Sequence, residues 1–169
     1  MLKSNQRSMT ILGIDPGLAD TGFGLVRKTG NQLTMVDFGC IKTKAGQPDA
    51  DRLFEIHDGL RQLIKKYQPS IMAVEKLFFC KNIKTAIAVG QARGVVVLTA
   101  GQHNLDLFEY TPLQVKQALT GYGRASKNQI KHMVKVVLNL ASLPKSDDAA
   151  DALAVAICCA NSGLKNMVK

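Results

Sequence analysis

The sequence predicts a single α/β domain with a mixed sheet flanked by helices. Short apolar, β-prone segments alternate along the chain with longer segments of helical periodicity, which is typical of this class. The 169 residues are 46% hydrophobic, enough for one buried core. No internal repeat, linker or low-complexity segment divides them. We expect an N-terminal extension at residues 1–8, one domain at 9–162 and a tail at 163–169.

Three strands open the predicted domain. Residues 10–14 (TILGI) form a short buried strand, and 22–27 (GFGLVR) follow after a turn at 16–21. Residues 33–43 continue with β-prone side chains. Because the connections are short, the three strands are expected to form a meander.

The rest of the chain alternates between helices and two further strands. Residues 49–68 repeat apolar side chains on one helical face and end before Pro69. Residues 82–101 are apolar nearly all round, which indicates a buried helix, and the small Ala86, Gly90 and Gly94 allow close approach of a neighbour. The remaining expected elements are strands at 70–74 and 105–110 and helices at 112–119, 126–141 and 147–162.

Four acidic residues stand next to apolar segments. Asp15 and Glu75 end predicted strands, and Asp148 and Asp151 share one face at the start of the last helix, opening an apolar stretch. A buried, unpaired carboxylate is too costly, so each must take up a proton, pair with a cation or bind a metal. Asp147 points roughly 100° away and is predicted to act as a capping or first-turn acid.

A shared metal site explains all four acids together, although each alone could be an ordinary turn residue. Ligands that are all oxygen indicate a hard cation such as Mg²⁺ or Mn²⁺. Two such ions about 3.5–4 Å apart can hydrolyse a phosphodiester. The sequence therefore predicts a metal-dependent enzyme.

The positive charge is concentrated in one part of the chain. The net charge is +9, and residues 76–146 contain ten basic residues but only two acids, Asp106 and Glu109. This is the electrostatic footprint of a nucleic-acid partner. The alternative is a solvated basic surface, and the predicted metal cluster favours nucleic acid.

Nothing in the sequence predicts a membrane or disulfide-bonded protein. No apolar run approaches the roughly 20 residues that span a bilayer, and residues 1–8 are polar and too short for a signal peptide, so we expect a cytoplasmic protein. Cys40, Cys80, Cys158 and Cys159 lack C-x-x-C spacing and are expected to be buried free thiols.

Several motifs resemble the RuvC-type Holliday-junction resolvases. They are TILGIDPG at 10–17, VEKLFF at 74–79, GQARG at 90–94, VKQ at 115–117, HMV at 132–134 and DAADALA at 148–154. The similarity runs from about residue 9 to about residue 160. It implies an RNase H-like fold, a homodimer, Mg²⁺ or Mn²⁺ (two ions per subunit), and paired symmetric nicks in four-way junction DNA.

The resemblance also implies roles for individual residues. The catalytic, metal-binding acids are Asp15, Glu75, Asp148 and Asp151, although some relatives carry His in place of Asp148. Lys116 and Lys127 match basic residues that support cleavage, and Phe78 matches an aromatic residue placed against the bases near the crossover. We add four basic residues as expected DNA contacts: Lys81, Lys84, Arg124 and Lys131. The helix at 82–101 is the candidate dimer interface, with the core of the single chain as its alternative, and a branch-migration complex is a further candidate partner.

Other functions remain as alternatives. The segment GIDPG at 13–17 is also similar to the phosphate-binding start of actin-like ATPases, which need a second lobe and a longer chain. An RNase H-like module could bind nucleic acid without cutting it, or a nuclease of this fold could act on RNA or RNA:DNA hybrids. Retention of all four acids favours an enzyme over a binding module.

Overall fold

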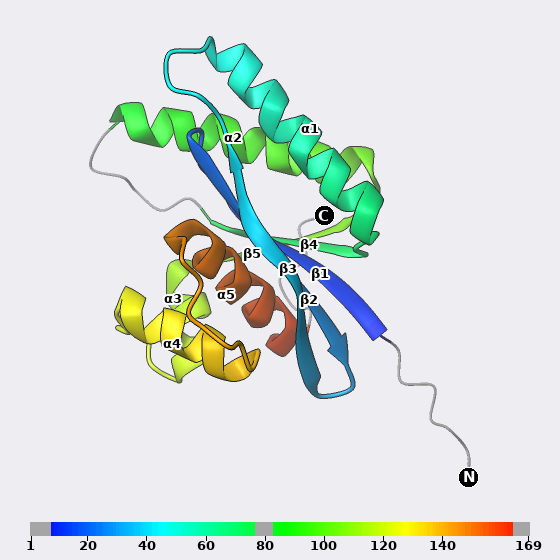
Figure 1. The fold of residues 1–169 in the computed structure, drawn as a ribbon, viewed down its shortest axis with the longest axis vertical. Helices are drawn as coiled ribbons and strands as arrows, with labels where there is room; N and C mark the ends of the chain where they lie inside the picture. Colours follow the sequence, from blue (N-terminus) through cyan, green and yellow to red (C-terminus); the bar gives the residue numbers. More distant parts are fainter. Residues whose placement is uncertain (1–7, 77–82, 164–169) are drawn as a thin grey trace.

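The structure, a computed structural model, describes residues 8–76 and 83–163 and contains one five-stranded sheet. The strand order is β3-β2-β1-β4-β5 (Figure 1). The strands are β1 (Ser8–Asp15), β2 (Asp20–Thr29), β3 (Gln32–Lys42), β4 (Ile71–Glu75) and β5 (Asp106–Tyr110). The first three form the predicted antiparallel meander, whereas β4 pairs parallel with β1 and β5 pairs parallel with β4. The predicted mixed sheet is confirmed.

Two helical layers cover the sheet (Figure 1). Helices α1 (Asp49–Tyr67) and α2 (Ile83–Gln102) lie on one face, and α3 (Pro112–Thr120), α4 (Lys127–Val137) and α5 (Asp147–Asn161) lie on the other. Alternate side chains of a strand point to opposite faces. On β1, Ile11 therefore packs in the core under α5, whereas Leu12 packs under α1 and α2.

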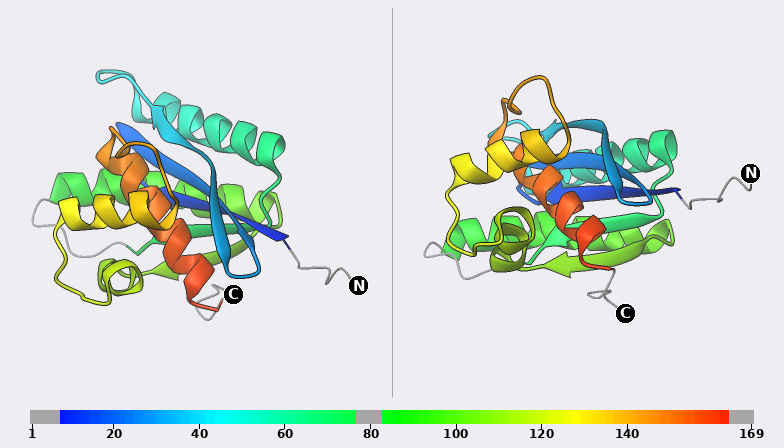
Figure 2. Two further views of the ribbon diagram at one scale, coloured as in Figure 1. Left: turned by 60° about the horizontal axis from the view of Figure 1, so that its bottom comes forward. Right: turned by 90° about the horizontal axis from the view of Figure 1, so that it is seen from below.

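Helix α5 lies across the meander (Figure 2) and approaches it closely. Glycines beneath it make this possible. A Cβ atom on Gly13 would lie 2.2 Å from the carbonyl oxygen of Ala152, and one on Gly22 would lie 2.1 Å from that of Asp148. Only glycine permits this approach. The acidic start of α5 is thereby held against the end of β1, where Asp15 lies, because Asp15 pairs with Gly22.

Helix α4 is shorter than predicted. It ends at Val137, whereas the sequence pattern suggested residue 141. Asn139 adopts a left-handed conformation (φ 49°), and the N–H of Leu140 donates to the carbonyl oxygen of Lys135. The chain therefore turns back after Leu138, whose buried side chain keeps the apolar pattern going beyond the helix.

Helix α2 is not buried all round, which corrects the prediction. Ala92, Val96 and Ala100 pack in the core, but Ile83, Ile87 and Leu98 are 76%, 58% and 58% exposed. A sequence that is apolar on every face does not show which face the chain itself covers. Helix α2 thus presents an apolar side to the outside.

Two of the three described cysteines agree with the prediction of buried free thiols. Cys158 and Cys159 are buried free thiols, and burial raises their pKa values to about 12 and about 11. Cys40 is free and partly buried, and Cys80 lies outside the described residues. Among the described helices, none is both long and apolar enough to cross a bilayer.

Candidate active site

Three of the four predicted acids line one cleft at the edge of the sheet. Asp15, Glu75 and Asp151 surround a cavity of about 370 Å³. Lys116 and Lys127 line it as well, and Pro112, Val115 and Ile130 supply its apolar wall. The cleft thus combines acidic side chains from the sheet and α5 with basic side chains from α3 and α4.

The topology explains this convergence. Asp15 and Glu75 are the last residues of β1 and β4, which are parallel neighbours, so both side chains emerge at the same sheet edge. Asp151 lies one turn inside α5, at a point where the helix is pressed onto the meander. Ser146 caps α5 by accepting a hydrogen bond from the backbone N–H of Ala149. The cap fixes where the helix begins and therefore where Asp151 points.

The acids in the cleft repel one another. Burial raises the pKa of Asp15 to about 8, helped by the negative charges of Asp151, Glu75 and Asp148. Burial also raises the pKa values of Glu75 and Asp151, against the opposing effect of Lys127 on both. Each carboxylate is thus less stable in its ionised form here than in water, and any added cation would relieve the repulsion.

The donor set fits a hard cation. The acids contribute only oxygen, and their mutual repulsion provides the favourable field that a divalent ion needs. Across residues 8–76 and 83–163, no three His, Cys, Asp or Glu side chains converge tightly enough to hold one ion between them. A cavity of this size instead suits ions that keep part of their water shell, as Mg²⁺ does.

Asp148 faces a neighbouring hollow. It shares this hollow with Gly17, Asp20 and Arg52, while its charge raises the pKa values of Asp15 and Asp151. Asp147 is a first-turn acid of α5, as predicted, and the cap is Ser146. Asp148 is thus electrostatically part of the acid cluster although it lines a different hollow.

The predicted basic residues occupy different environments. Lys127 Nζ lies 3.7 Å from Asp151 Oδ2, with a side chain that is 73% exposed, and the charge of Lys116 lowers the pKa of Glu75. Lys131 forms an ion pair with Asp147, and Arg124 is exposed in the turn between α3 and α4. Phe78, Lys81 and the side chain of Lys84 lie outside the described residues.

Two features were missed from the sequence. Arg93 counts toward the basic segment, but its guanidinium pairs with Glu109 and joins α2 to β5, so it is not a free cation. Arg52, outside that segment, lines the hollow beside Asp148 and donates from Nε to Thr43 Oγ1 at 2.8 Å. Composition alone reveals neither, because both depend on which elements pack together.

Comparison with known proteins places the chain in a family. A family model described as crossover junction endodeoxyribonuclease RuvC matches residues 11–159. The enzyme of that name from Halothermothrix orenii is 56% identical over 154 residues, covering 91% of this chain and 93% of the relative. The one from Ruminiclostridium cellulolyticum is 54% identical, with the same coverage.

Solved structures show the same fold. T. thermophilus RuvC in complex with a Holliday junction substrate superposes with a TM-score of 0.90 at 33% identity, covering 95% of this chain and 99% of that one. The yeast mitochondrial Holliday junction resolvase Ydc2, at 15% identity, has a TM-score of 0.65 over 93% of this chain and 80% of its own, a likeness of fold alone. With carboxylates and lysines gathered at one sheet edge, and sequence similarity along nearly its whole length, this chain belongs to the RuvC family of crossover junction endodeoxyribonucleases.

Proposed function

We propose that the protein resolves four-way DNA junctions by paired symmetric nicks during recombination and repair in the cytoplasm. The observation that supports this most strongly is the cleft itself. Asp15, Glu75 and Asp151 line it together with Lys116 and Lys127, so that acids able to hold cations face bases able to hold a phosphodiester.

Asp15, Glu75, Asp148 and Asp151 would hold two Mg²⁺ ions, or Mn²⁺ in their place. Bound there, the ions would activate water and stabilise charge on the phosphate. The protein supplies the remaining work. Buried strand ends fix Asp15 and Glu75, the capped start of α5 fixes the other two acids, and the apolar wall of the cleft limits access of bulk water.

The lysines would bind and orient the DNA strand. Lys127 lies close enough to Asp151 to exchange that partner for a phosphate oxygen once cations occupy the acids. Lys116 reaches the same cleft from α3. Arg124, Lys131, Lys81 and Lys84 are proposed as outer contacts, and Phe78 as the aromatic residue placed against bases at the crossover.

The direct test is cleavage of a labelled four-way junction with Mg²⁺, beside a linear duplex and an RNA:DNA hybrid of matched sequence. We expect two symmetric nicks in the junction and little cutting of either control. Preferential cutting of the hybrid would instead support the alternative, a nuclease of this fold acting on RNA:DNA.

Substitution of Lys116 or Lys127 by Ala should weaken junction binding through lost phosphate contacts. Each contact contributes roughly 0.7–0.9 to the slope of log affinity against log salt, so each variant should reduce the slope by about that amount. Lys131→Ala should change it less, because Lys131 must first leave Asp147. Binding titrations at several salt concentrations measure this, and unchanged slopes for Lys116 and Lys127 would contradict the proposed contacts.

A homodimer would place two such sites on one junction. Exposed residues on one side of α2 recur at alternating intervals of four and three residues: Ile87, Gln91, Gly94 and Leu98. This is the spacing with which one helix packs along another. A two-fold axis through this side would make the same surface self-complementary. It would also relate two clefts, as paired nicks require.

Leu98→Asp should therefore dissociate the dimer, because it would bury an unpaired charge in an apolar contact. Sedimentation at micromolar concentration should give dimer for the wild type and monomer for the variant. The matched control is Leu143→Asp, which is 46% exposed in the connection before α5 and should leave the dimer intact. A monomeric wild-type protein would rule the interface out.

A further inference from the structure

The α3–α4 unit carries an excess of positive charge, although Lys127 and Lys131 pair with Asp151 and Asp147 of α5. Residues 111–146 contain six basic residues and no Asp or Glu. Lys116 and Lys127 extend from this unit into the cleft, one from each helix. Lys127 is the first residue of α4, so the turn between the two helices is joined directly to a residue that lines the cleft. The basic residues around it create a field that attracts polyanions.

This turn is rigid. Helix α3 ends at Gly121 in a left-handed conformation (φ 69°). The N–H of Tyr122 donates to Thr120 Oγ1 at 3.1 Å, and the same hydroxyl lies 2.8 Å from the Tyr122 carbonyl oxygen. Ser126 then starts α4 with a capping box. The backbone on both sides of Tyr122 is thus fixed by local hydrogen bonds.

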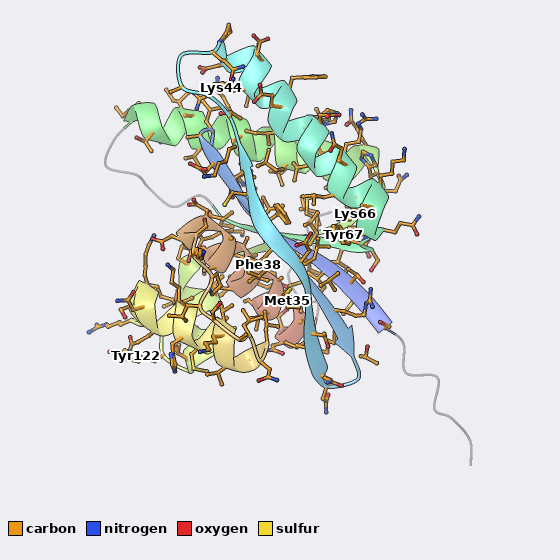
Figure 3. The ribbon with its side chains drawn as sticks, in the orientation of Figure 1. Met35, Phe38, Lys44, Lys66, Tyr67 and Tyr122 are labelled. Atoms are coloured by element: carbon orange, nitrogen blue, oxygen red, sulfur yellow. The ribbon has the colours of Figure 1, made fainter. Side chains whose placement is uncertain are left out.

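The Tyr122 side chain is exposed. It is 59% exposed and lies at the outer tip of the α3–α4 unit, away from the sheet (Figure 3). An exposed aromatic ring on a fixed turn contributes little to the core. Tyr122 is one of the residues that line a hollow of about 490 Å³ between the two helices.

The hollow combines an apolar floor with a polar rim. Leu119, Ala125 and Met133 form apolar parts of it, and Asn128, Gln129 and His132 bring polar groups. A nucleobase has flat apolar faces and a polar edge, so it matches both surfaces. Stacking on an aromatic ring beside basic residues is how proteins commonly hold unpaired bases.

We propose that Tyr122 and this hollow take up a nucleobase of the DNA strand whose phosphate lies in the cleft, with Arg124 on a flanking phosphate. Lys116 and Lys127 bind the phosphate backbone of the DNA strand and direct it toward the turn between α3 and α4. The ring of Tyr122 then stacks on a base of that strand. This assignment rests on the proposed function, since it needs the cleft to hold DNA.

A single tryptophan reports on the contact. The chain contains no Trp, so Tyr122→Trp introduces the sole indole, and combining it with Asp15→Asn prevents cleavage. Adding a four-way junction should quench its emission by stacking. The control is Val136→Trp in the same background, on the last turn of α4 and 58% exposed, whose emission should stay constant. Equal responses at both positions would overturn the proposal.

Affinity provides the second measurement. Tyr122→Ala should weaken junction binding by roughly 5- to 150-fold, the range expected for losing one stacked base, whereas Tyr122→Phe should bind like the wild type. Both variants should melt at the wild-type temperature because the side chain is exposed. Wild-type affinity for Tyr122→Ala would overturn the proposal. Anisotropy of labelled DNA distinguishes failure of the base-stacking proposal from failure of the proposed function. If the Asp15→Asn protein does not bind a junction at all, the proposed function itself fails.

Discussion

Asp15→Asn should abolish junction cleavage while leaving junction binding intact or slightly tighter. Burial and the neighbouring acids raise the pKa of Asp15 to about 8, and its replacement would remove a proposed metal ligand and a negative charge that would face phosphate. The loss should exceed the roughly 10- to 100-fold typical of residues that act behind a metal ligand. Single-turnover cleavage and a binding titration on the same junction measure the two effects separately.

The matched control for Asp15→Asn is Asp106→Asn. Asp106 is an exposed acid at the start of β5, outside the residues that line the cleft. This variant should cut and bind like the wild type. If Asp15→Asn cleaved at a rate near that of the wild type, Asp15 would not be a metal ligand.

The same substitution should stabilise the protein when divalent cations are removed. In the fold, the pKa of Asp15 is about 8, above its usual value of 3.8, so the folded state favours the protonated form. The contribution of protonated Asp15 to the free energy of unfolding is fully present below pH 3.8 and is lost as the pH rises to about 8. Without divalent cations, the wild type should therefore melt at a higher temperature at pH 5 than at pH 8. The Asp15→Asn variant should show a smaller difference between the two pH values.

Added Mg²⁺ should reverse the loss at pH 8, because the ion replaces the proton as the partner of the carboxylates. The gain in melting temperature should be larger at pH 8 than at pH 5, and should shrink in Asp15→Asn. If Mg²⁺ left the melting temperature of the wild type unchanged at both pH values, this would contradict metal binding in the cleft.

Gly22→Ala should impair cleavage although Gly22 does not line the cleft. Its Cβ would lie 2.1 Å from the carbonyl oxygen of Asp148 and 2.4 Å from the carbonyl carbon, so the first turn of α5 must move. Overpacking of this kind costs about 1–3 kcal/mol, or roughly 2–4 °C in melting temperature per kcal/mol. Displacing Asp148 and Asp151 by about 1 Å should slow cleavage by on the order of 10²-fold.

Gly39→Ala provides the comparison for Gly22→Ala. A Cβ on Gly39, in β3, would meet only the ring of Phe23 at 3.0 Å, and a side chain can yield where a helix backbone cannot. This variant should lose less stability and keep its cleavage rate. Equal loss of cleavage in both variants would mean that the close packing of α5 on the sheet does not determine the positions of Asp148 and Asp151.

The sequence by itself determined the sheet, most of the helices and the four acids. Strand and helix periods are local properties, so β1, β4 and α5 could be located, with Asp15 and Glu75 at strand ends and Asp148 and Asp151 on one helical face. The end of α4 could not, because a buried Leu138 continues the apolar pattern after the helix has turned back at Asn139.

Only the tertiary structure decided which of these residues meet and which surfaces stay open. Glycines under α5 let Asp151 share the cleft with Asp15 and Glu75, while Asp148 faces the neighbouring hollow. Packing against β5 converted Arg93 from a free cation to a paired one, and it left one apolar side of α2 uncovered. The physical reason is that contacts between distant segments depend on which faces of the helices and strands are turned toward one another. A local sequence pattern shows which face of an element is apolar, but not which other element packs against it.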